Sequence, residues 1–337
     1  MKTLLSFFFL SSISLYCLSN NNSDSTKNVF SSIGKIQTKI FSNYHTSLND
    51  NENNSGFEIT RAYFGYKYQL SENFSTELKI DMGDPNDGGE GSNLRRYAYF
   101  KTASLCYEAK KIMWNFGIIE LTQFKLQENF WGHRYITRSY QEEYGFGTSA
   151  DIGSGIFYKP VEKICIDFVV MNSEGYTKLQ GDETYKVAMG ISYLNKEGLT
   201  GRLYCDYSEK ATAISTFSGF IGYAYKQYAS LGIESSLQKN YDYSNNQNIY
   251  GFSTYCNINF SEKWQLFGRY DYLNSNQLQN MDYRWNISKN GQALITGIQY
   301  SPLKNIRIAA NYQHWEPTCN NIGVKQFFYL NFEYQVN

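Results

Sequence analysis

The sequence predicts an all-β protein: a transmembrane antiparallel β-barrel of about 16 strands, with a long third external loop folded inward. Three observations support this fold class. The chain begins with a segment typical of exported proteins. Its body is polar on average but rich in aromatic residues at alternate positions. Short turns and long polar loops alternate strictly along the chain.

Residues 1–19 form a predicted signal peptide. Lys2 precedes an apolar run from Leu4 to Leu18, and the small Ser19 suits cleavage before Asn20. A basic start, a short apolar stretch and a small residue at the cleavage point are the marks of an export signal. Cleavage here leaves 337 − 19 = 318 residues.

A lipoprotein anchor on Cys17 is the competing interpretation of the N-terminus, but the bulky Tyr16 stands where a small residue is normally required. Residues 20–33 are rich in Asn and Ser and are predicted to form a periplasmic lead-in. Residues 34–337 then form the barrel, which the signal directs to the cell outer membrane.

Composition favours a barrel over other membrane proteins. After the signal, no apolar run approaches the roughly 18 residues of a membrane helix, which excludes a helical membrane protein. Aromatic residues make up 18% of the chain, with 31 tyrosines and only four prolines. A barrel needs apolar residues at every other position and aromatic residues at both membrane interfaces, so this composition fits one.

Charge and cysteine content exclude several functions. The 31 basic and 31 acidic residues balance, so a nucleic-acid partner has no electrostatic support. Five cysteines outside the signal are scattered singly, without metal or redox spacing. No cofactor and no metal are therefore predicted. The scattered cysteines are Cys106, Cys165, Cys205, Cys256 and Cys319.

Period-2 alternation identifies the strands. In Arg61–Leu70, in Tyr185–Tyr193 and at the C-terminus, apolar or aromatic residues alternate with polar or small ones. Lipid on one side and a water-filled lumen on the other explain this division. Leu94–Glu108 is ambiguous, and neither Arg95 nor Arg96 can be assigned to a face. A soluble β-sandwich would also alternate, but it rarely needs eight successive hairpins.

Connection lengths give the strand number. Seven short turns and eight long loops make fifteen connections, hence about sixteen strands. The short turns are Ser71–Asn73, Ala109–Lys111, Pro160–Lys163, Asn195–Gly198, Lys226–Gln227, Ser261–Lys263 and Pro302–Asn305. The long loops are His45–Gly56, Gly83–Asn93, Thr122–Gly147, Ser173–Thr184, Ser208–Ala213, Lys239–Asn248, Asn274–Asn290 and Glu316–Lys325.

The third of these loops, Thr122–Gly147, is the candidate constriction. It lacks alternation, exceeds an ordinary hairpin connection and mixes aromatic residues with cations. Long loops inside a regular architecture are usually functional, and a lumen of sixteen strands is too wide for wall side chains to fill. We expect the loop to fold inward and narrow the lumen. Its candidate solute-binding residues are Lys125, His133, Arg134 and Arg138.

The roles of the charged residues remain open. Cations of the loop either face the lumen and favour small anions, or pair with Glu128, Glu142 and Glu143 and hold the loop down. Wall charges either form paired braces or create a field that filters solutes. The aromatic residues of the loop are interpreted as packing anchors in preference to a track on which sugars stack. The candidate pore-lining cations are Arg61, Lys67, Lys186, Arg202, Arg269 and Arg307.

Enzymatic function has little support. The chain has only three histidines, and it contains neither a GxSxG nor an HExxH motif. We therefore predict that the protein is not an enzyme. Asp84, Asp87 and Glu90 have the composition of a divalent-ion loop but not its spacing, and are interpreted as part of an external loop.

Several stretches, in their order along the chain, resemble the porin O and P family of phosphate-selective porin-like barrels. They are Phe57–Gly83, Gln127–Ser139, Ser149–Gly153 and Asn172–Tyr176. The resemblance implies a sixteen-stranded outer-membrane porin that forms a homotrimer. Family members that select phosphate carry an arginine ladder, whereas here the arginines stand beside nearly as many acids. The chain also ends in Val336–Asn337 instead of an aromatic residue.

The sequence therefore predicts a porin that passes small hydrophilic solutes by passive diffusion, with mild preference for anions such as phosphate or carboxylates. Its expected partners are outer-membrane lipid, the solutes and two further copies of the chain. The alternative is a structural or adhesive barrel with a plugged lumen, whose function lies in external loops such as Asn274–Asn290.

Overall fold

The computed structural model describes residues 34–49, 54–83, 97–195, 197–279, 281–319 and 322–336. The predicted signal peptide and lead-in lie outside the described residues. So do Arg95, Arg96 and most of the external loop 83–93. No helix in the described part is long and apolar enough to cross a membrane.

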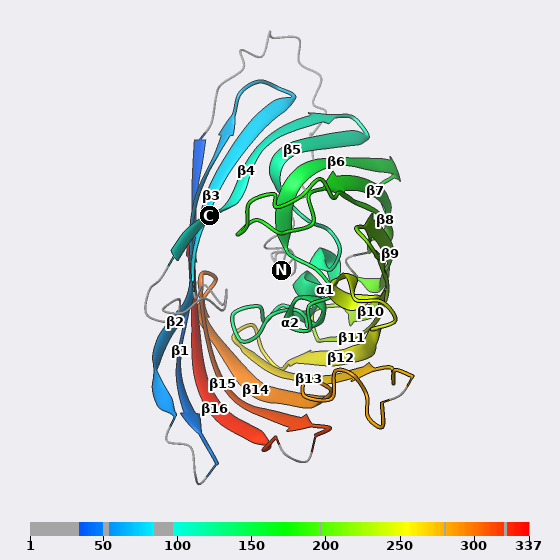
Figure 1. Cartoon of the computed structure of the whole chain (residues 1–337). Helices are drawn as coiled ribbons and strands as arrows, with labels where there is room; N and C mark the ends of the chain where they lie inside the picture. Colours follow the sequence, from blue (N-terminus) through cyan, green and yellow to red (C-terminus); the bar gives the residue numbers. More distant parts are fainter. Residues whose placement is uncertain are drawn as a thin grey trace.

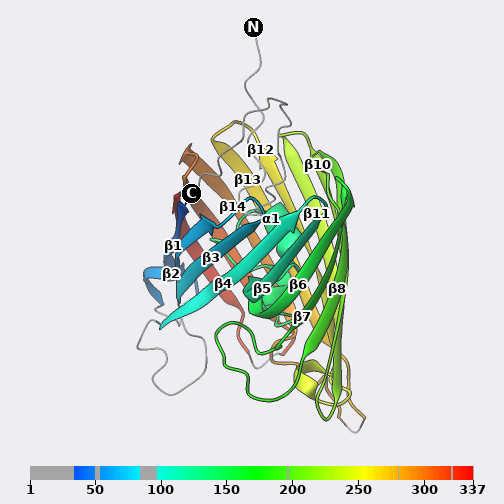
Figure 2. The same cartoon turned by 90° about the horizontal axis from the view of Figure 1, so that it is seen from above.

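Sixteen antiparallel strands close into a barrel, because each pairs with the next along the chain and β1 also pairs with β16 (Figures 1 and 2). The strands are β1 (Gly34–Ser47), β2 (Ser55–Gln69), β3 (Phe74–Gly83), β4 (Tyr97–Ala109), β5 (Ile112–Glu120), β6 (Ala150–Val161), β7 (Ile164–Met171), β8 (Lys186–Tyr193), β9 (Gly198–Glu209), β10 (Ala213–Tyr225), β11 (Ala229–Lys239), β12 (Ile249–Asn259), β13 (Trp264–Ser275), β14 (Gly291–Leu303), β15 (Ile306–Pro317) and β16 (Lys325–Val336). The predicted fold class and strand number are confirmed.

The connections between strands alternate between short and long as predicted, with one exception. All seven short turns fall where the sequence placed them. The predicted long loop Ser208–Ala213 is wrong, since β9 continues to Glu209 and β10 begins at Ala213. Ser208 is buried and continues the inward-facing series of β9, so its polarity does not mark a loop.

The two faces of the wall differ as the alternation predicted. In β8, Met189 is 52% exposed on the outside while the neighbouring Ala188 is 3% exposed on the inside. In β16, Phe328 and Tyr334 face outward, whereas Asn331 and Glu333 are buried within the barrel. Polar and charged side chains thus gather inside, and apolar ones cover the outside.

Two β-bulges explain where the alternation breaks down. Lys79 pairs with Thr102 but Ile80 pairs with Phe100, so Lys101 is an extra residue in β4. A bulge of this kind turns two successive side chains to one face. Lys101 and Thr102 are both buried inside, which accounts for the ambiguous parity of this segment in the sequence. A second bulge lies at Thr60 in β2.

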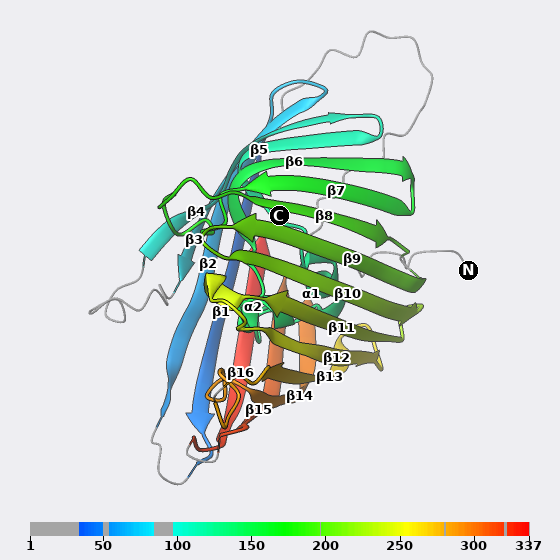
Figure 3. The same cartoon turned by 45° about the vertical axis from the view of Figure 1, so that its right-hand side comes forward.

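The connection between β5 and β6 carries two short helices, α1 (Lys125–Trp131) and α2 (Tyr140–Glu143). Both lie within the ring of strands, beside β10, β11 and β12 (Figures 1 and 3). Gly132 ends α1 in the left-handed conformation, at φ 78°, and its N–H donates to the carbonyl of Glu128. A glycine suits this position because it has no Cβ to clash there.

Candidate functional site

The segment Leu121–Ser149 packs against the inner face of the wall through aromatic residues. Trp131 and Tyr135 join Phe220, Tyr255 and Phe267 in one buried apolar cluster. The cluster also includes Phe41, Ile295 and Ala309, so strands on both sides of the β1–β16 seam contribute to it. As the sequence suggested, the loop aromatics act as packing anchors.

Three wall arginines hold the backbone of this segment. Arg202 donates to the carbonyl of Gln123 at 3.3 Å, Arg269 to that of Arg138 at 2.7 Å, and Arg307 to that of Gly132 at 2.7 Å. Each therefore satisfies a loop carbonyl that has lost contact with water. These predicted pore-lining cations are anchors of the segment.

The same arginines are neutralised by wall carboxylates. Arg202 forms a bidentate pair with Asp167, at 2.7 and 2.9 Å, and Arg269 does so with Asp271, at 2.7 and 2.8 Å. Arg307 pairs with Glu333, its direct cross-strand neighbour. Buried charges need such partners, so these three cations add little net positive charge to the lumen.

Arg134 forms ion pairs with two acidic residues of its own segment. Its guanidinium lies 3.0 Å from Glu128 and 2.7 Å from Glu142. Burial opposes its charge, but Glu142 and Glu128 outweigh that effect and raise the pKa of Arg134 above its usual value. Lys125 lies 3.4 Å from Glu128 and 3.8 Å from Glu120. Of the two readings of these cations, pairing within the loop is the one the geometry supports.

His133 lies inside the packed segment. Its ring centroid is 4.3 Å from that of Phe267 and 4.7 Å from that of Trp131, and Nδ1 donates to the Trp131 carbonyl at 2.8 Å. Burial, together with the charge of Arg307, lowers the pKa of His133 to about 3. The ring is only 1% exposed, a position that does not favour the predicted binding of solute by His133.

The wall opposite α2 carries a second polar group, on β2, β3 and β4. Arg61 lies 3.1 Å from Asp81, which also accepts the phenolic hydrogen bond of Tyr176 at 2.6 Å. Tyr176 belongs to the connection between β7 and β8, so a second connection reaches this wall. Lys79 is neutralised by Glu77 at 2.8 Å and by Glu120 at 2.9 Å.

Lys101 differs from these cations. Its ammonium hydrogen-bonds to Ser149 and lies 4.1 Å above the ring of Tyr176. No carboxylate among the described residues lies within 4 Å of it, although its side chain is buried in the wall. Burial without a carboxylate partner disfavours the charged form of an amine, so an anion close by would stabilise the ammonium.

The charged residues of the inner segment and those of the wall strands β2, β3 and β4 face each other across the lumen. Burial raises the pKa of Glu142 in α2, but nearby cations outweigh that effect and lower it. Arg134 has the largest influence among these cations, followed by Arg61 and Lys101 of the opposite wall. We define the constriction cluster as Arg61, Lys101, Arg134, Glu142 and Tyr176.

Sequence reasoning found only part of this cluster. Arg61 and Arg134 were predicted, whereas Lys101 and Tyr176 were missed as site residues. Lys101 was hidden by the bulge, and Tyr176 by its place in a polar loop. The backbone carbonyl of Arg138 accepts a hydrogen bond from Arg269, and the Arg138 side chain lies in the electrostatic range of Glu142.

The other two predicted pore-lining residues lie elsewhere on the inner wall. Lys67 faces Glu77 in the β2–β3 register. Lys186 faces Ser208 in β9 and lies in the electrostatic range of Asp151. Neither is a member of the constriction cluster.

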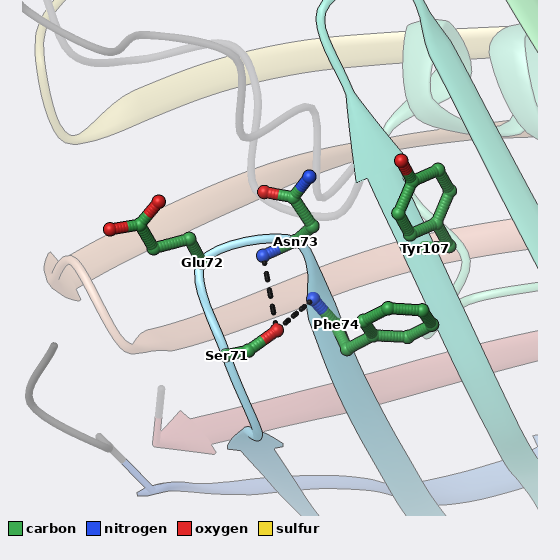
Figure 4. Close-up of a pocket in the computed structure, with 5 residues that line it drawn as sticks. All are labelled: Ser71, Glu72, Asn73, Phe74 and Tyr107. Carbon is green, nitrogen blue, oxygen red and sulfur yellow. Dashed lines mark hydrogen bonds between the residues drawn. The ribbon is translucent and has the colours of Figure 1, made fainter.

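A shallow depression lies outside the lumen, at the turn between β2 and β3 (Figure 4). The hydroxyl of Ser71 accepts the backbone N–H groups of Asn73 at 3.4 Å and Phe74 at 3.1 Å. These polar groups serve the turn itself, so the depression has no part in the candidate site. Its lining is Ser71, Glu72, Asn73, Phe74 and Tyr107.

Fold and site together define a barrel of the porin type, closed by sixteen strands and narrowed from within. No protein-family model and no curated protein matches the sequence.

Solved structures do match this architecture. OmpF of Salmonella typhi, solved in complex with daunomycin, aligns with a TM-score of 0.68 at 10% identity, covering 90% of this chain and 97% of that one. DcaP, an outer-membrane channel of Acinetobacter baumannii, aligns with a TM-score of 0.65 at 13% identity, covering 90% and 97%. The anion-selective porin of Comamonas acidovorans aligns with a TM-score of 0.63 at 10% identity, covering 91% and 100%. At these identities the likeness shows the fold.

Proposed function

We propose that the protein is an outer-membrane porin that passes small hydrophilic solutes by passive diffusion. The observation that carries this proposal is the division of the closed wall into an apolar outer face and a charged inner face. Only a closed barrel leaves no unpaired strand edge in lipid, and a lumen lined with charge stays wet.

Aromatic residues near the short turns support a membrane position. On the outer face Trp264 packs against Tyr300, with ring centroids 4.6 Å apart, and Phe74 packs against Tyr107, at 4.9 Å. Tyr228 stands in the turn between β10 and β11 and is 51% exposed. Amphipathic rings at one end of a barrel are suited to the boundary between lipid and water.

A mild preference for anions is the second part of the proposal. Lys101 places an amine on the inner wall that no described carboxylate neutralises within 4 Å, and Arg61, which is paired with Asp81 at 3.1 Å, lies on the same wall. A small carboxylate or phosphate passing the constriction cluster would be attracted there. One neighbour in fold is an anion-selective porin, which agrees with this preference.

Membership of the porin O and P family and assembly as a homotrimer are further parts of the proposal. Both rest on the sequence resemblance. OmpT from Vibrio cholerae, solved in a trimer form, is similar in fold with a TM-score of 0.60 at 11% identity, covering 91% of this chain and 100% of that one.

Planar-bilayer recording tests the proposal. Purified protein should give ohmic conductance, and in a salt gradient the reversal potential should show modest anion preference. Protein that inserts into the bilayer without conducting contradicts the porin function. Cation preference contradicts only the second part.

A plugged structural barrel is the second candidate, and the burial inside the lumen favours it. Trp131, Tyr135 and Tyr140 are each at most 2% exposed, so the segment seals the part of the lumen next to β10–β16. The same recording decides between the two functions, because a plugged barrel does not conduct.

A further inference from the structure

Five aromatic rings stand together at the end of the lumen where the predicted external loops join β1, β15 and β16. They are His45, Tyr144, Trp315, Phe327 and Tyr329, and we call them the aromatic patch. His45 lies 5.7 Å from Tyr329 and 6.3 Å from Phe327 between ring centroids, and Phe327 lies 5.7 Å from Tyr329.

The remaining two rings continue the patch across β15. Trp315 lies 6.1 Å from Tyr144 of the inner segment. Gln313 faces Phe327 in the β15–β16 register, so Trp315 is the diagonal neighbour of Phe327. Diagonal neighbours on one face of a sheet remain within reach of aromatic side chains.

The wall strands turn these rings into the lumen. Phe327 and Tyr329 share the face of Asn331, whose side chain donates to the carbonyl of Tyr135 in the inner segment. His45 shares the face of Phe41, which belongs to the buried cluster around Trp131. The patch thus occupies the space between the constriction cluster and the mouth.

The patch is only half-buried, unlike the rings deeper in the lumen. Trp131, Tyr135 and Phe41 are sealed by packing, whereas all five rings of the patch keep part of their surface open. Apolar surface left in water forgoes the stabilisation that burial would provide. A ligand that covers the rings would recover it.

Two carboxylates give the patch its chemical character. Glu58 of β2 and Glu143 of α2 both lie in the electrostatic range of the Tyr329 hydroxyl. Neither forms an ion pair with any cation of the described residues within 4 Å. Both can therefore accept hydrogen bonds from a ligand, and both repel an anionic one.

We propose that the aromatic patch binds neutral sugar rings of an oligosaccharide before they enter the constriction. The C–H faces of a sugar stack on aromatic rings, and its hydroxyls donate to Glu58 and Glu143. This inference rests on the proposed channel function and deepens it by naming a solute class. Anions would then interact at Lys101, and neutral sugars nearer the mouth.

Current block by maltohexaose in planar bilayers is the first test. We expect concentration-dependent block of the wild-type channel. Trp315→Ala and Tyr329→Ala should each weaken it roughly fivefold, as expected for the loss of one stacked ring. Tyr228→Ala removes a ring outside the lumen and should leave the block unchanged. Equal block by a polyethylene glycol of the same hydrodynamic size, or equal block in all variants, overturns the proposal.

A binding measurement separates failure of the patch from failure of the channel. Saturation-transfer NMR with maltohexaose and the detergent-solubilised barrel does not require conduction. Transfer should appear for the wild type and fall for Glu143→Gln, whose side chain is exposed and whose substitution leaves the wall packing intact. A folded wild-type barrel without transfer overturns the patch even if it conducts. Transfer without conductance upholds the patch and contradicts the channel.

Discussion

At the scale of single residues, the cations of the lumen fall into two groups. Arg202, Arg269 and Arg307 each pair with a carboxylate and donate to a loop carbonyl. Their charge is therefore neutralised by contacts that hold the inner segment. Lys101 has a hydroxyl and a ring as its neighbours. Selectivity should therefore depend more on this lysine than on the arginines.

Replacing Lys101 tests this difference. Lys101→Ala should lower the anion-to-cation permeability ratio roughly threefold, because it removes a buried amine of the inner wall that no described carboxylate neutralises within 4 Å. Reversal potentials in a salt gradient measure the ratio. Lys111→Ala is the matched control, because Lys111 lies in the exposed β4–β5 turn and donates to the carbonyl of Pro160. A Lys101→Ala channel with wild-type selectivity would refute the role of this lysine.

Replacing Arg134 should act mainly on stability. Arg134→Ala leaves Glu128 and Glu142 close together without their shared cation, which costs about 3 kcal/mol when such groups are buried and somewhat less here. The urea midpoint of the refolded barrel measures this loss. Arg134→Lys keeps the charge but cannot span both carboxylates, so it should rescue only part of it. An unchanged midpoint in the alanine variant would show that the pairs do not brace the segment.

The residue scale is also where prediction from sequence stopped. Arg134 could be recognised as a loop cation, and its acids were visible within the same segment. That Arg202 and Arg269 bind loop carbonyls could not be seen, because backbone contacts leave no pattern in a sequence. Lys101 was lost because a bulge shifts the alternation by one residue.

At the scale of elements, the inner segment is held by one aromatic anchor more than by its helices. Both α1 and α2 are far shorter than an isolated helix needs to be stable. The indole of Trp131 is 1% exposed among Tyr255, Phe267 and His133. The long aromatic loop was recognisable in the sequence, but its contacts with seven or more strands depended on the closed wall.

Removing that anchor should loosen the segment while the wall stays closed. Trp131→Ala deletes a buried side chain of a kind that costs about 3–5 kcal/mol. We expect larger and noisier single-channel conductance, with the heat-modifiable gel migration of a folded barrel retained. Trp264→Ala, on the outer face beside Tyr300, should leave conductance unchanged. Quiet wild-type conductance in Trp131→Ala would mean that other contacts hold the segment.

At the scale of the whole molecule, the sequence predicted most of the architecture. The alternation of short and long connections predicted the strand number, because each connection reverses the chain and joins two successive strands. One connection, at Lys210–Thr212, proved too short for the rule. The alternation of short and long connections is still recognisable in the sequence, because the other seven long loops define the pattern.

Stability of the whole barrel should depend on pH through His133. Its pKa is lowered from 6.5 to about 3 by burial, so the unfolded chain takes up a proton that the folded protein excludes. This contribution to stability is complete above pH 6.5 and is lost as pH falls towards 3, at roughly 1.4 kcal/mol per pH unit.

Urea midpoints between pH 7 and pH 4 measure this dependence. His133→Gln should flatten the slope relative to the wild type, whereas His45→Gln, at a half-exposed ring, serves as the control. A slope unaffected by His133→Gln would assign the acid sensitivity to the carboxylates instead.

The seam between the first and last strands is bridged from within. Tyr135 donates to Gln299 of β14 at 2.8 Å, its carbonyl accepts from Asn331 of β16, and its ring lies 6.5 Å from that of Phe41 in β1. Tyr135 thus connects strands on both sides of the position where the barrel closes. We expect loss of this bridge to weaken the barrel first at the pairing of β1 with β16.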